Sequence, residues 1–395
     1  MTDWTGGVAA LLPADAERAT LVGRAWDPAA GGPSVVAVRD GLVIDLSRHV
    51  ATMSELTEST VDVATLDGPP LGTLADLLAN APADGRDASN PWLLSPIDLH
   101  VVKAAGVTFP VSMLERIIEE RALGAADAAE SVRAGILGSL GTDLSDLVPG
   151  SPEAMLLKDH LIAEGLWSQY LEVGIGPDAE IFTKAPVLAT VGTGVDVGVR
   201  SDSHWNNPEP EVVLVIASDG RIVGATLGND VNLRDIEGRS ALLLGQAKDN
   251  NASAAVGPFL RLFDAGFDLD ALRRETITLH VDGADGYALD ARSHMEQISR
   301  DPADLAAQTL GDRHQYPDGL VLYLGTMFAP SDDRGEAGHG FTHHRDDIVR
   351  ISSPALGALV NRVRSTEDVE PWVYGIGSLM TNLAERGLLI RQVLA

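Results

Sequence analysis

The stretch "NNPEPEVVLVIASDGRIVGATLGND", residues 206–230, decides the fold of the region around it. One apolar run follows two glutamates, Glu209 and Glu211, and a second apolar run follows the dipeptide Asp219-Gly220. An Asp-Gly dipeptide between two apolar runs favours a two-residue β-hairpin turn. The stretch therefore predicts an antiparallel hairpin of two buried strands, closed at this dipeptide.

The predicted turn also determines which residues of the two strands face each other. With a two-residue loop, Glu211 lies opposite Gly228. Two residues further along, Glu209 lies opposite Asp230. Directly opposed residues share a face of an antiparallel pair, and so do residues two apart on one strand. We therefore expect Glu209, Glu211 and Asp230 to project from one face at one end of the hairpin.

Three carboxylates this close repel one another, and their pKa values rise unless a cation lies among them. Oxygen ligands without histidine or cysteine suit Mg²⁺, and also Mn²⁺ or Ca²⁺. The third acid at the matching register favours a metal site over a solvated strand end that merely carries acidic residues. A glycosidase-like acid pair is a weaker alternative, because it needs carboxyl groups in different surroundings.

Composition limits the classes of function. The chain has 395 residues, of which 45% are hydrophobic, and a formal charge of −28. Such an acidic surface repels nucleic-acid phosphates, so an anionic substrate would need a metal or basic side chains to reverse the local field. The absence of cysteine excludes disulfides, zinc–thiolate sites, iron–sulfur clusters and a cysteine nucleophile. The apolar runs are too short for a membrane span and the first residues do not resemble a secretory signal, so we expect a cytoplasmic protein without a membrane partner.

Turn-forming residues divide the chain into two predicted domains. A hairpin is predicted in residues 34–47, because two alternating apolar runs flank an Asp-Gly dipeptide. The stretch "NAPADGRDASNPW", residues 80–92, is rich in Pro, Gly, Asp and Asn and is typical of a linker. We therefore predict a small N-terminal β-containing domain at residues 1–91 and a larger domain at residues 92–395.

Two helices are predicted early in the larger domain, and mainly strands after them. In "SMLERIIEERA", Ser112 and Glu115 have capping-box spacing, so both are expected to cap a helix. "SPEAMLLKDHLIAEGLWSQYLEV" is predicted as one helix, with Ser151 at its N-cap and Pro152 at its first position. From Ile181 onward, short apolar runs alternate with turns, which indicates a β-rich core.

Other residues become candidates only in context. Lys248 in "LLLGQAKDNN", Glu180 in "DAEIFTKAP" and the nearby Lys184 are individually typical of solvated surface positions. The Gly325-Thr326 turn in "LVLYLGTMFAP" could offer a backbone N–H and a hydroxyl to a carboxylate, or be an ordinary strand end.

The histidines of "GEAGHGFTHHRDD", namely His339, His343 and His344, raise the alternative of a transition-metal site. The glycines argue against a helix that would align them, so a polar turn is favoured. The chain lacks a G-x-S-x-G elbow, a Walker loop and a G-x-G-x-x-G fingerprint, so serine-hydrolase, P-loop and Rossmann hypotheses have no support.

At "RSDSHWNNPEPEVVLVI", "GNDVNLRDIEG", "GQAK" and "LGTMFAP" the sequence resembles the fumarylacetoacetate hydrolase superfamily, with the motifs in the family's order. The resemblance covers about residues 92–395. It implies an α/β, β-rich fold, a mixed β-roll around a divalent metal, in a homodimer or homotetramer. It also implies that the three acids of the hairpin are the metal ligands, which agrees with the register argument.

Within the superfamily, the R-S-D-S-x-W run before P-E-P-E resembles the dehydratases of 2-keto-3-deoxy-pentonates. By this resemblance, Glu180 is the acid/base residue and Lys248 is the active-site lysine. The residues expected to bind substrate are Gly325, Thr326, Arg234 and Lys184.

The resemblance therefore predicts a Mg²⁺-dependent hydro-lyase of pentose catabolism. It would convert a small anionic 2-keto-3-deoxy-pentonate to 2,5-dioxopentanoate through a metal-stabilised enolate. The first alternative is a C–C hydrolase of acylpyruvates or fumarylacetoacetate, but the histidine typical of hydrolase members has no counterpart between His100 and His160. The second alternative is a non-catalytic, metal-dependent sugar-acid-binding protein.

Overall fold

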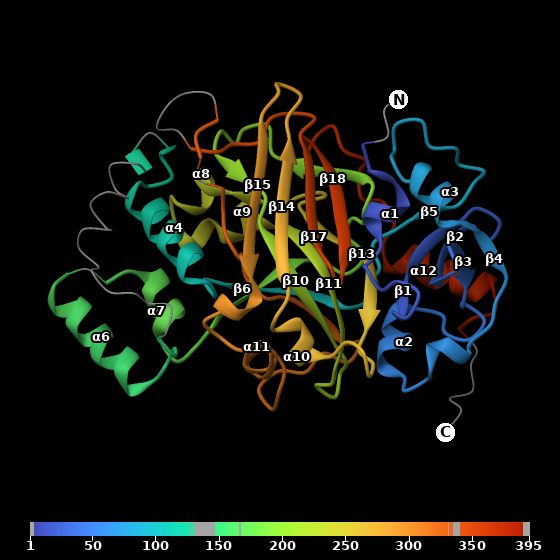
Figure 1. The fold of residues 1–395 in the computed structure, drawn as a ribbon, viewed down its shortest axis with the longest axis horizontal. Coiled ribbons are helices and arrows are strands. Elements are labelled where there is room, and N and C mark those ends of the chain that lie inside the picture. Colours follow the sequence, from blue (N-terminus) through green and yellow to red (C-terminus); the bar gives the residue numbers. More distant parts are fainter. Residues whose placement is uncertain are drawn as a thin grey trace.

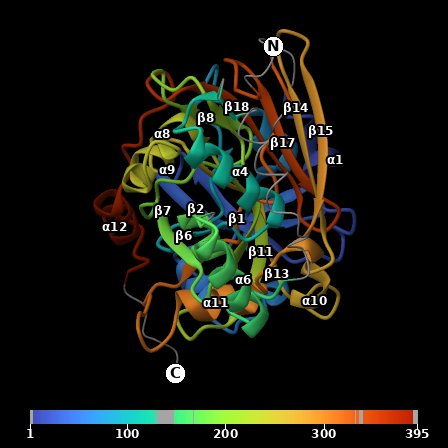
Figure 2. The same cartoon turned by 90° about the vertical axis from the view of Figure 1, so that its left-hand side faces the viewer.

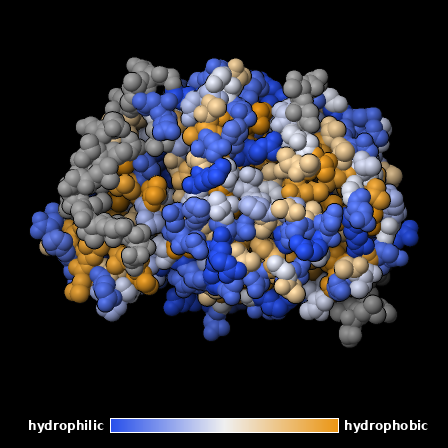
Figure 3. All heavy atoms as spheres, viewed as in Figure 1, coloured by the Kyte–Doolittle hydropathy of each residue, from blue (hydrophilic) through white to orange (hydrophobic). Residues whose placement is uncertain are grey.

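The structure, a computed structural model, describes residues 4–126, 128–129, 147–165, 167–330, 332–334 and 340–389. Two β-sheets lie at its centre, with helices α4 (Pro110–Arg121), α6 (Pro152–Ala163) and α7 (Gln169–Ile175) grouped at one end (Figure 1). The smaller sheet and helix α12 (Ile376–Glu385) lie on opposite sides of the molecule (Figure 2). On the face drawn in Figure 3, hydrophilic residues cover much of the centre and apolar residues gather towards the two ends.

The predicted hairpin is present as β10 (Pro210–Ile216) and β11 (Ile222–Asp230), and the pairing of Glu211 is as predicted. One rung further, the backbone N–H of Asp230 donates to the carbonyl oxygen of Glu209 at 3.1 Å. The predicted register is therefore confirmed at the end of the hairpin where the acids lie.

The turn of this hairpin differs from the prediction. The backbone N–H of Ala217 donates to the carbonyl oxygen of Arg221, so residues 218–220 form a three-residue loop instead of a two-residue one. A bulge between Val215 and Ile216 places one extra residue in the second strand. The bulge compensates for the longer loop, which is why the register beyond it still holds.

The hairpin lies in the middle of the larger sheet, which has eleven strands among the described residues. The order across this sheet is β4 (Pro70–Thr73), β3 (Leu42–Asp45), β2 (Gly32–Arg39), β1 (Leu21–Asp27), β13 (Ala254–Leu262), β11, β10, β16 (Leu320–Tyr323), β6 (Val101–Gly106) and β7 (Glu180–Ala185), with β5 (Trp92–Leu93) paired to β1. Neighbours in this order are antiparallel except β16 and β6, which are parallel. A central strand covered on both faces needs an unbroken apolar run, and every residue of β10 is buried.

A smaller sheet covers one face of the larger one. Its order is β15 (Ala288–His294), β14 (Thr276–Asp282), β17 (Ile348–Ser353), β18 (Gly357–Ser365) and β8 (Val195–Val199). Leu214 and Leu227 of the hairpin share one apolar core with Leu279 and Ile351 of this sheet. Two further short strands, β9 (Asn206–Asn207) and β12 (Asn232–Leu233), pair just beyond the acidic end of the hairpin.

The strands of the predicted N-terminal domain extend the larger sheet. Strand β1 pairs with β13, with Val22 opposite Leu260. The hairpin predicted in residues 34–47 is confirmed, because Arg39 lies opposite Leu42 across its turn. The boundary between residues 91 and 92 stays a prediction.

The prediction for the start of α4 was wrong. The helix begins at Pro110 after Phe109, so Ser112 and Glu115 lie inside it and do not cap it. Proline is favoured at the first helical position because that position needs no N–H partner. This signal lies two residues before the Ser-x-x-Glu pattern and determines where the helix starts.

The single helix predicted from residue 151 is two helices, α6 and α7. Its predicted N-cap is confirmed, because the Ser151 hydroxyl accepts a hydrogen bond from the backbone N–H of Ala154 at 3.1 Å. Gly165, with φ of 67°, follows the end of α6, and Ser168 caps the start of α7.

The remaining helices are short. They are α1 (Gly7–Leu11), α2 (Met53–Glu58), α3 (Leu74–Ala79), α8 (Arg234–Glu237), α9 (Leu244–Lys248), α10 (Leu269–Leu272) and α11 (Pro302–Thr309). Among the residues described, no helix has the length and apolar character needed to cross a membrane.

Candidate metal and active site

Three carboxylates meet at the end of the hairpin, as its register predicts. Glu209, Glu211 and Asp230 are all buried, and one oxygen atom from each lies within 4.8 Å of the others. They form the one cluster of potential metal ligands among the described residues. Their shared face is therefore confirmed, and their role as ligands stays a prediction until a metal is measured.

The Gly325-Thr326 turn holds Glu211. The backbone N–H of Gly325 donates to Glu211 Oε2 at 2.7 Å, and the Thr326 hydroxyl donates to Glu211 Oε1 at 3.2 Å. Gly325 has φ of 103°, and an added Cβ would lie 1.9 Å from Thr108 Oγ1, so only glycine fits. The turn does offer an N–H and a hydroxyl to a carboxylate, but that carboxylate belongs to the protein. The predicted contact of these two residues with substrate stays a prediction, and Thr326 lines the small cavity beside the triad.

Two lysines contact the triad, and neither is a solvated surface residue. Lys248 Nζ contacts Glu209 Oε2 and lies 3.1 Å from Asp230 Oδ2. Lys184 Nζ lies 2.6 Å from Asp230 Oδ1. Both lysines are buried. Their ammonium groups partly neutralise the acids. Lys184 was predicted to contact substrate, and in this structure it contacts a protein carboxylate instead.

The two lysines differ in how strongly they hold a proton. Burial lowers the pKa of Lys184, although Asp230 opposes the shift. Burial would also lower the pKa of Lys248, but Asp230 and Glu209 outweigh it and raise that pKa above its usual value. Lys248 therefore stays protonated, and a protonated amine donates hydrogen bonds but does not attack a carbonyl carbon.

The glutamates of the triad differ in the same way. Burial would raise the pKa of Glu209, but Arg116 and Lys248 outweigh it and lower the pKa to about 2. For Glu211, burial together with the charges of Asp230 and Glu209 raises the pKa well above its usual value. A divalent cation among these oxygens would favour the ionised form of Glu211. The donor set and its charge therefore fit a hard cation such as Mg²⁺.

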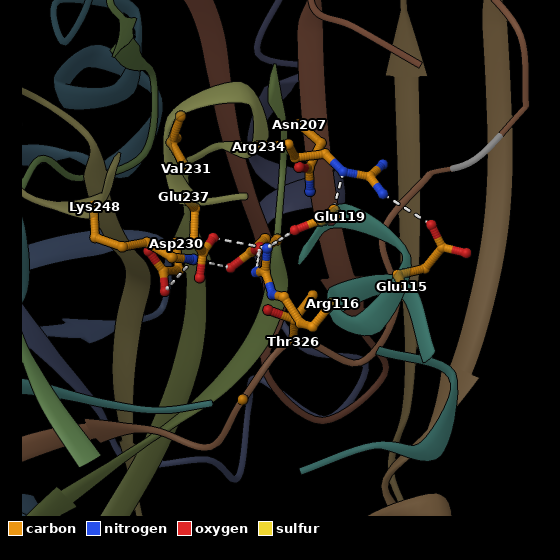
Figure 4. Close-up of polar contacts among 12 residues, drawn as sticks. Glu115, Arg116, Glu119, Asn207, Asp230, Val231, Arg234, Glu237, Lys248 and Thr326 are labelled. Carbon is orange, nitrogen blue, oxygen red and sulfur yellow. Dashed lines mark hydrogen bonds and ion pairs between the residues drawn. The ribbon is translucent and has the colours of Figure 1, made fainter. Parts of the chain in front are cut away.

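A buried arginine that sequence reasoning missed connects Glu209 to helix α4. Figure 4 shows this residue, Arg116, close to Glu119 and Glu237. Arg116 Nη2 contacts Glu209 Oε1. Its other terminal nitrogen, Nη1, lies 2.7 Å from Glu119 Oε2 and 2.7 Å from Glu237 Oε2. Burial raises the pKa of Glu237 to about 7, although Arg116 and Lys248 oppose the shift. One guanidinium thus contacts three carboxylates, one in α4, one in α8 and one immediately before β10.

Arg234 was predicted to bind substrate, and the structure gives it another role. Arg234 is fully buried, with Nε 2.6 Å from Glu119 Oε1 and Nη2 2.8 Å from Glu115 Oε2. Its guanidinium also lies over the ring of Trp205, 4.3 Å from the centroid. Substrate binding by Arg234 stays a prediction, and in this structure its guanidinium is buried and paired with two acids of helix α4. Glu115 likewise forms this ion pair instead of a helix cap.

Glu180 is the predicted site residue whose carboxylate stays free. It opens strand β7 opposite Gly106 of β6, and it lines a small cavity together with Lys248 and Asp230. Burial raises the pKa of Glu180. No hydrogen bond or ion pair joins its carboxylate to another of the residues that the structure describes. The cavity lining also includes Ala105, Val107, Arg116, Phe182, Glu209, Glu237 and Thr326.

The histidine alternative has no support. His339 lies outside the described residues. His343 Nδ1 lies 3.3 Å from Asp347 Oδ2, whereas His344 Nδ1 lies 3.1 Å from Asp285 Oδ2. The two described histidines thus pair with different aspartates and do not form a common site.

Residues 173–364 match the family model described as fumarylacetoacetate (FAA) hydrolase C-terminal. This range contains the triad, both lysines, Glu180, Arg234, Glu237 and the Gly-Thr turn. It does not contain α4, so Arg116 lies outside the matched domain.

Two relatives match about half of the chain. One is the 2-dehydro-3-deoxy-D-arabinonate dehydratase of Saccharolobus solfataricus, 31% identical over 193 residues, which are 48% of this chain and 60% of the relative. The other is a probable 2-keto-3-deoxyxylonate dehydratase of Haloferax volcanii, 33% identical over 195 residues, which are 49% of this chain and 63% of the relative. The matched part therefore spans less than two thirds of either relative.

Solved structures share the fold. A 2-keto-3-deoxy-D-arabinonate dehydratase complexed with magnesium and 2,5-dioxopentanoate has a TM-score of 0.61 at 22% identity, over 88% of this chain and 99% of that chain. The fumarylacetoacetate hydrolase of Exiguobacterium antarcticum has a TM-score of 0.55 at 14% identity, over 88% and 99% of the two chains. The predicted α/β, β-rich fold of the fumarylacetoacetate hydrolase type is confirmed.

Proposed function

We propose that this protein is a divalent-metal-dependent dehydratase. The premise is that residues 173–364 match the fumarylacetoacetate hydrolase model. The substrate of this protein is a 2-keto-3-deoxy-pentonate and its product is 2,5-dioxopentanoate. The two relatives named as pentonate dehydratases support this substrate class. The solved dehydratase complexed with magnesium and 2,5-dioxopentanoate supports the metal and the product.

The free carboxylate of Glu180 is the observation that carries the proposal. It shares a cavity with Asp230 of the triad and with Lys248, whereas the other carboxylates around the cavity are already paired. A carboxyl group with a raised pKa can accept a proton and later return it at a pH near neutral. Dehydration requires this proton transfer and no activated water.

The triad fits Mg²⁺, Mn²⁺ or Ca²⁺, because its donors are buried carboxylate oxygens that converge within 4.8 Å. Glu209, Glu211 and Asp230 would hold the ion. When bound, it supplies Lewis-acid stabilisation of negative charge on the substrate oxygens.

The protein's own residues carry the proton transfers. Glu180 takes the proton from C3 of the substrate. The C4 hydroxyl then leaves as water after Glu180 returns a proton to it, which leaves a C3–C4 double bond conjugated with the C2 ketone. Transfer of a proton from C5 to C3 converts this product to the C4–C5 enol, and protonation at C4 with loss of the hydroxyl proton gives the C5 aldehyde. Lys248, protonated and buried, donates a hydrogen bond to the C2 oxygen as negative charge develops there.

The partner of the site is a small anionic 2-keto sugar acid. The proposal also includes a homodimer or homotetramer and a cytoplasmic location. Sedimentation equilibrium on the full chain measures the oligomeric state.

A C–C hydrolase with the same metal site is the first alternative. It needs a base that activates water, and helix α4, which follows β6, carries no histidine. A non-catalytic sugar-acid-binding protein is the second alternative. It would bind 2-keto acids without converting them.

An activity screen with product identification tests these alternatives. Purified protein with Mg²⁺ is offered 2-keto-3-deoxy-pentonates and acylpyruvates, and the products are identified by mass spectrometry. We expect loss of one water from a pentonate, no activity after chelation, and poor cleavage of acylpyruvates. Glu180→Gln should stop dehydration and leave Mn²⁺ binding intact. Faster acylpyruvate cleavage would show that the water-activating base has been missed.

A further inference from the structure

Buried charges alternate in a row that starts at a proposed metal ligand and continues along helix α4. The row runs from Glu209 to Arg116, then to Glu119, Arg234 and Glu115. Every member is less than a tenth exposed. The close-up in Figure 4 shows the arginines between the acids, with α4 carrying three of the five residues. A row of this kind holds α4 and the start of β10 at a defined separation.

The contacts of Glu209 divide between its two oxygens. Oε1 contacts Arg116, and Oε2 contacts Lys248 and belongs to the side on which Asp230 lies. The position of Arg116 is itself set by Glu119 and Glu237, each 2.7 Å from its Nη1. The guanidinium fork therefore meets Glu209 from one fixed direction and restricts rotation of the carboxylate.

We propose that Arg116 is a positioning residue that orients Glu209 for metal binding. It does not touch the reacting atoms. It holds Oε1 of Glu209 and so fixes the direction of Oε2, which contacts Lys248 beside Asp230. This inference rests on the metal site of the proposed function and extends it to a residue outside the matched family domain.

The planar guanidinium of arginine explains why a positive charge alone would not orient Glu209. An arginine presents its donors in a fixed plane and reaches two acceptors from one nitrogen while its other nitrogen holds a third. A lysine at position 116 would keep the positive charge but lose this geometry. Comparing the two substitutions therefore separates orientation of Glu209 from neutralisation of its charge.

Mn²⁺ binding to the full chain, followed by the loss of the EPR signal of free Mn²⁺, tests the proposal without an activity assay. The variants are Arg116→Lys, Arg116→Gln and Arg116→Gln combined with Glu237→Gln, which removes one acid that Arg116→Gln would leave buried and unpaired. We expect all three to bind Mn²⁺ about 10- to 100-fold more weakly, as for residues that orient a metal ligand. The line shape of bound Mn²⁺ should also change in Arg116→Lys.

Arg261→Lys is the matched control. Arg261 is equally buried and also pairs with a carboxylate, that of Asp15, and that pair is not part of the row. Its substitution should leave Mn²⁺ affinity unchanged.

Each outcome decides the question. Weak binding by all three Arg116 variants supports the positioning role. Wild-type affinity in Arg116→Lys, with loss only in Arg116→Gln, would show that charge alone matters and overturn it. Tighter binding in Arg116→Gln would show that Arg116 repels the cation and would also overturn it. A wild-type chain that binds no Mn²⁺ would overturn the metal site of the proposed function together with this inference.

Discussion

At the scale of single residues, one glycine determines where the proposed acid/base carboxylate lies. An added Cβ at Gly106 would come within 2.0 Å of Glu180 Oε2. Because this oxygen ends a flexible side chain, Gly106→Ala should leave the fold intact and displace the carboxylate. We expect kcat for a 2-keto-3-deoxy-pentonate to fall about 100-fold, the effect of moving a reacting group by about 1 Å. Steady-state kinetics measures this, and Mn²⁺ affinity should not change.

Gly245→Ala is the control for that substitution. Nothing lies within 4 Å of a Cβ added at Gly245, so its activity should match the wild type. A Gly106→Ala enzyme with wild-type kcat would argue against Glu180 as the proton-transfer residue.

Glu237 should make stability depend on pH in a defined direction. Its pKa is about 7 in the folded protein and is ordinarily 4.5. Between these values the folded state holds a proton that the unfolded state has released, so the free energy of unfolding falls as the pH rises from about 4.5 to about 7. At about 1.4 kcal/mol for each pKa unit, the loss is a few kcal/mol. Urea unfolding of the metal-free protein at several pH values measures it.

Glu237→Gln removes the titrating group and should remove this part of the pH dependence. If the variant loses stability with rising pH as steeply as the wild type, another buried acid is responsible. Glu211, whose pKa is also raised, is the candidate for that role.

The triad could be predicted from the sequence, whereas Arg116 could not. Strand alternation and one Asp-Gly turn relate Glu209, Glu211 and Asp230 by simple counting. Arg116 meets Glu209 and Glu237 only in the tertiary structure, because both lie outside helix α4. Along the sequence, Arg116 and Glu119 are an ordinary i,i+3 pair of the kind that covers helix surfaces. Burial is what distinguishes this pair from a surface pair, and periodicity alone does not reveal it.

At the scale of elements, the register of the hairpin was predicted correctly although the length of its turn was predicted wrongly. Two irregularities that compensate for each other explain this. The three-residue loop at residues 218–220 and the bulge beside Val215 each shift the pairing by one residue. Bulges depend on local twist and packing, so a hydrophobic pattern does not locate them. A register shifted by one residue would turn the side chains of one strand to the opposite face of the sheet. Burial of both apolar runs therefore favours the predicted pairing beyond the bulge.

The start of α4 illustrates a conflict between two helix signals. A Ser-x-x-Glu pattern suggested a cap at Ser112, and proline two residues earlier set the true start. We therefore expect Ser112→Ala to change the free energy of unfolding by less than about 0.5 kcal/mol, since alanine is the better helix former. Ser151→Ala, which removes an observed cap, should cost about 1 kcal/mol. Chemical denaturation of both variants gives the comparison, and equal losses would mean that Ser112 is needed for another reason.

At the scale of the whole molecule, the N-terminal residues and the rest of the chain share sheet and core. Val22 and Val35 lie in one apolar cluster with Val256, Leu260 and Val321. Most of the turn-rich stretch at residues 80–92 is an exposed loop, as its composition indicates, but sequence patterns cannot say whether the strands on its two sides pair. Such pairing is long-range and depends on which strand edges remain free.

A chain reduced to residues 92–395 should therefore not fold stably. It would lose the strand paired to β13, where Leu21 and Val22 face Arg261 and Leu260, and it would expose apolar side chains that β1 and β2 cover. An uncovered strand edge next to apolar surface favours aggregation. We expect the truncated chain to be insoluble or to bind a hydrophobic dye and unfold without a cooperative transition.

A protease site placed in the exposed loop around Gly85 provides the control. The full chain, once folded and then cut there, should elute as one particle and keep its Mn²⁺ affinity. A truncated chain that is soluble, unfolds cooperatively and binds Mn²⁺ like the full chain would instead establish residues 92–395 as an independent domain.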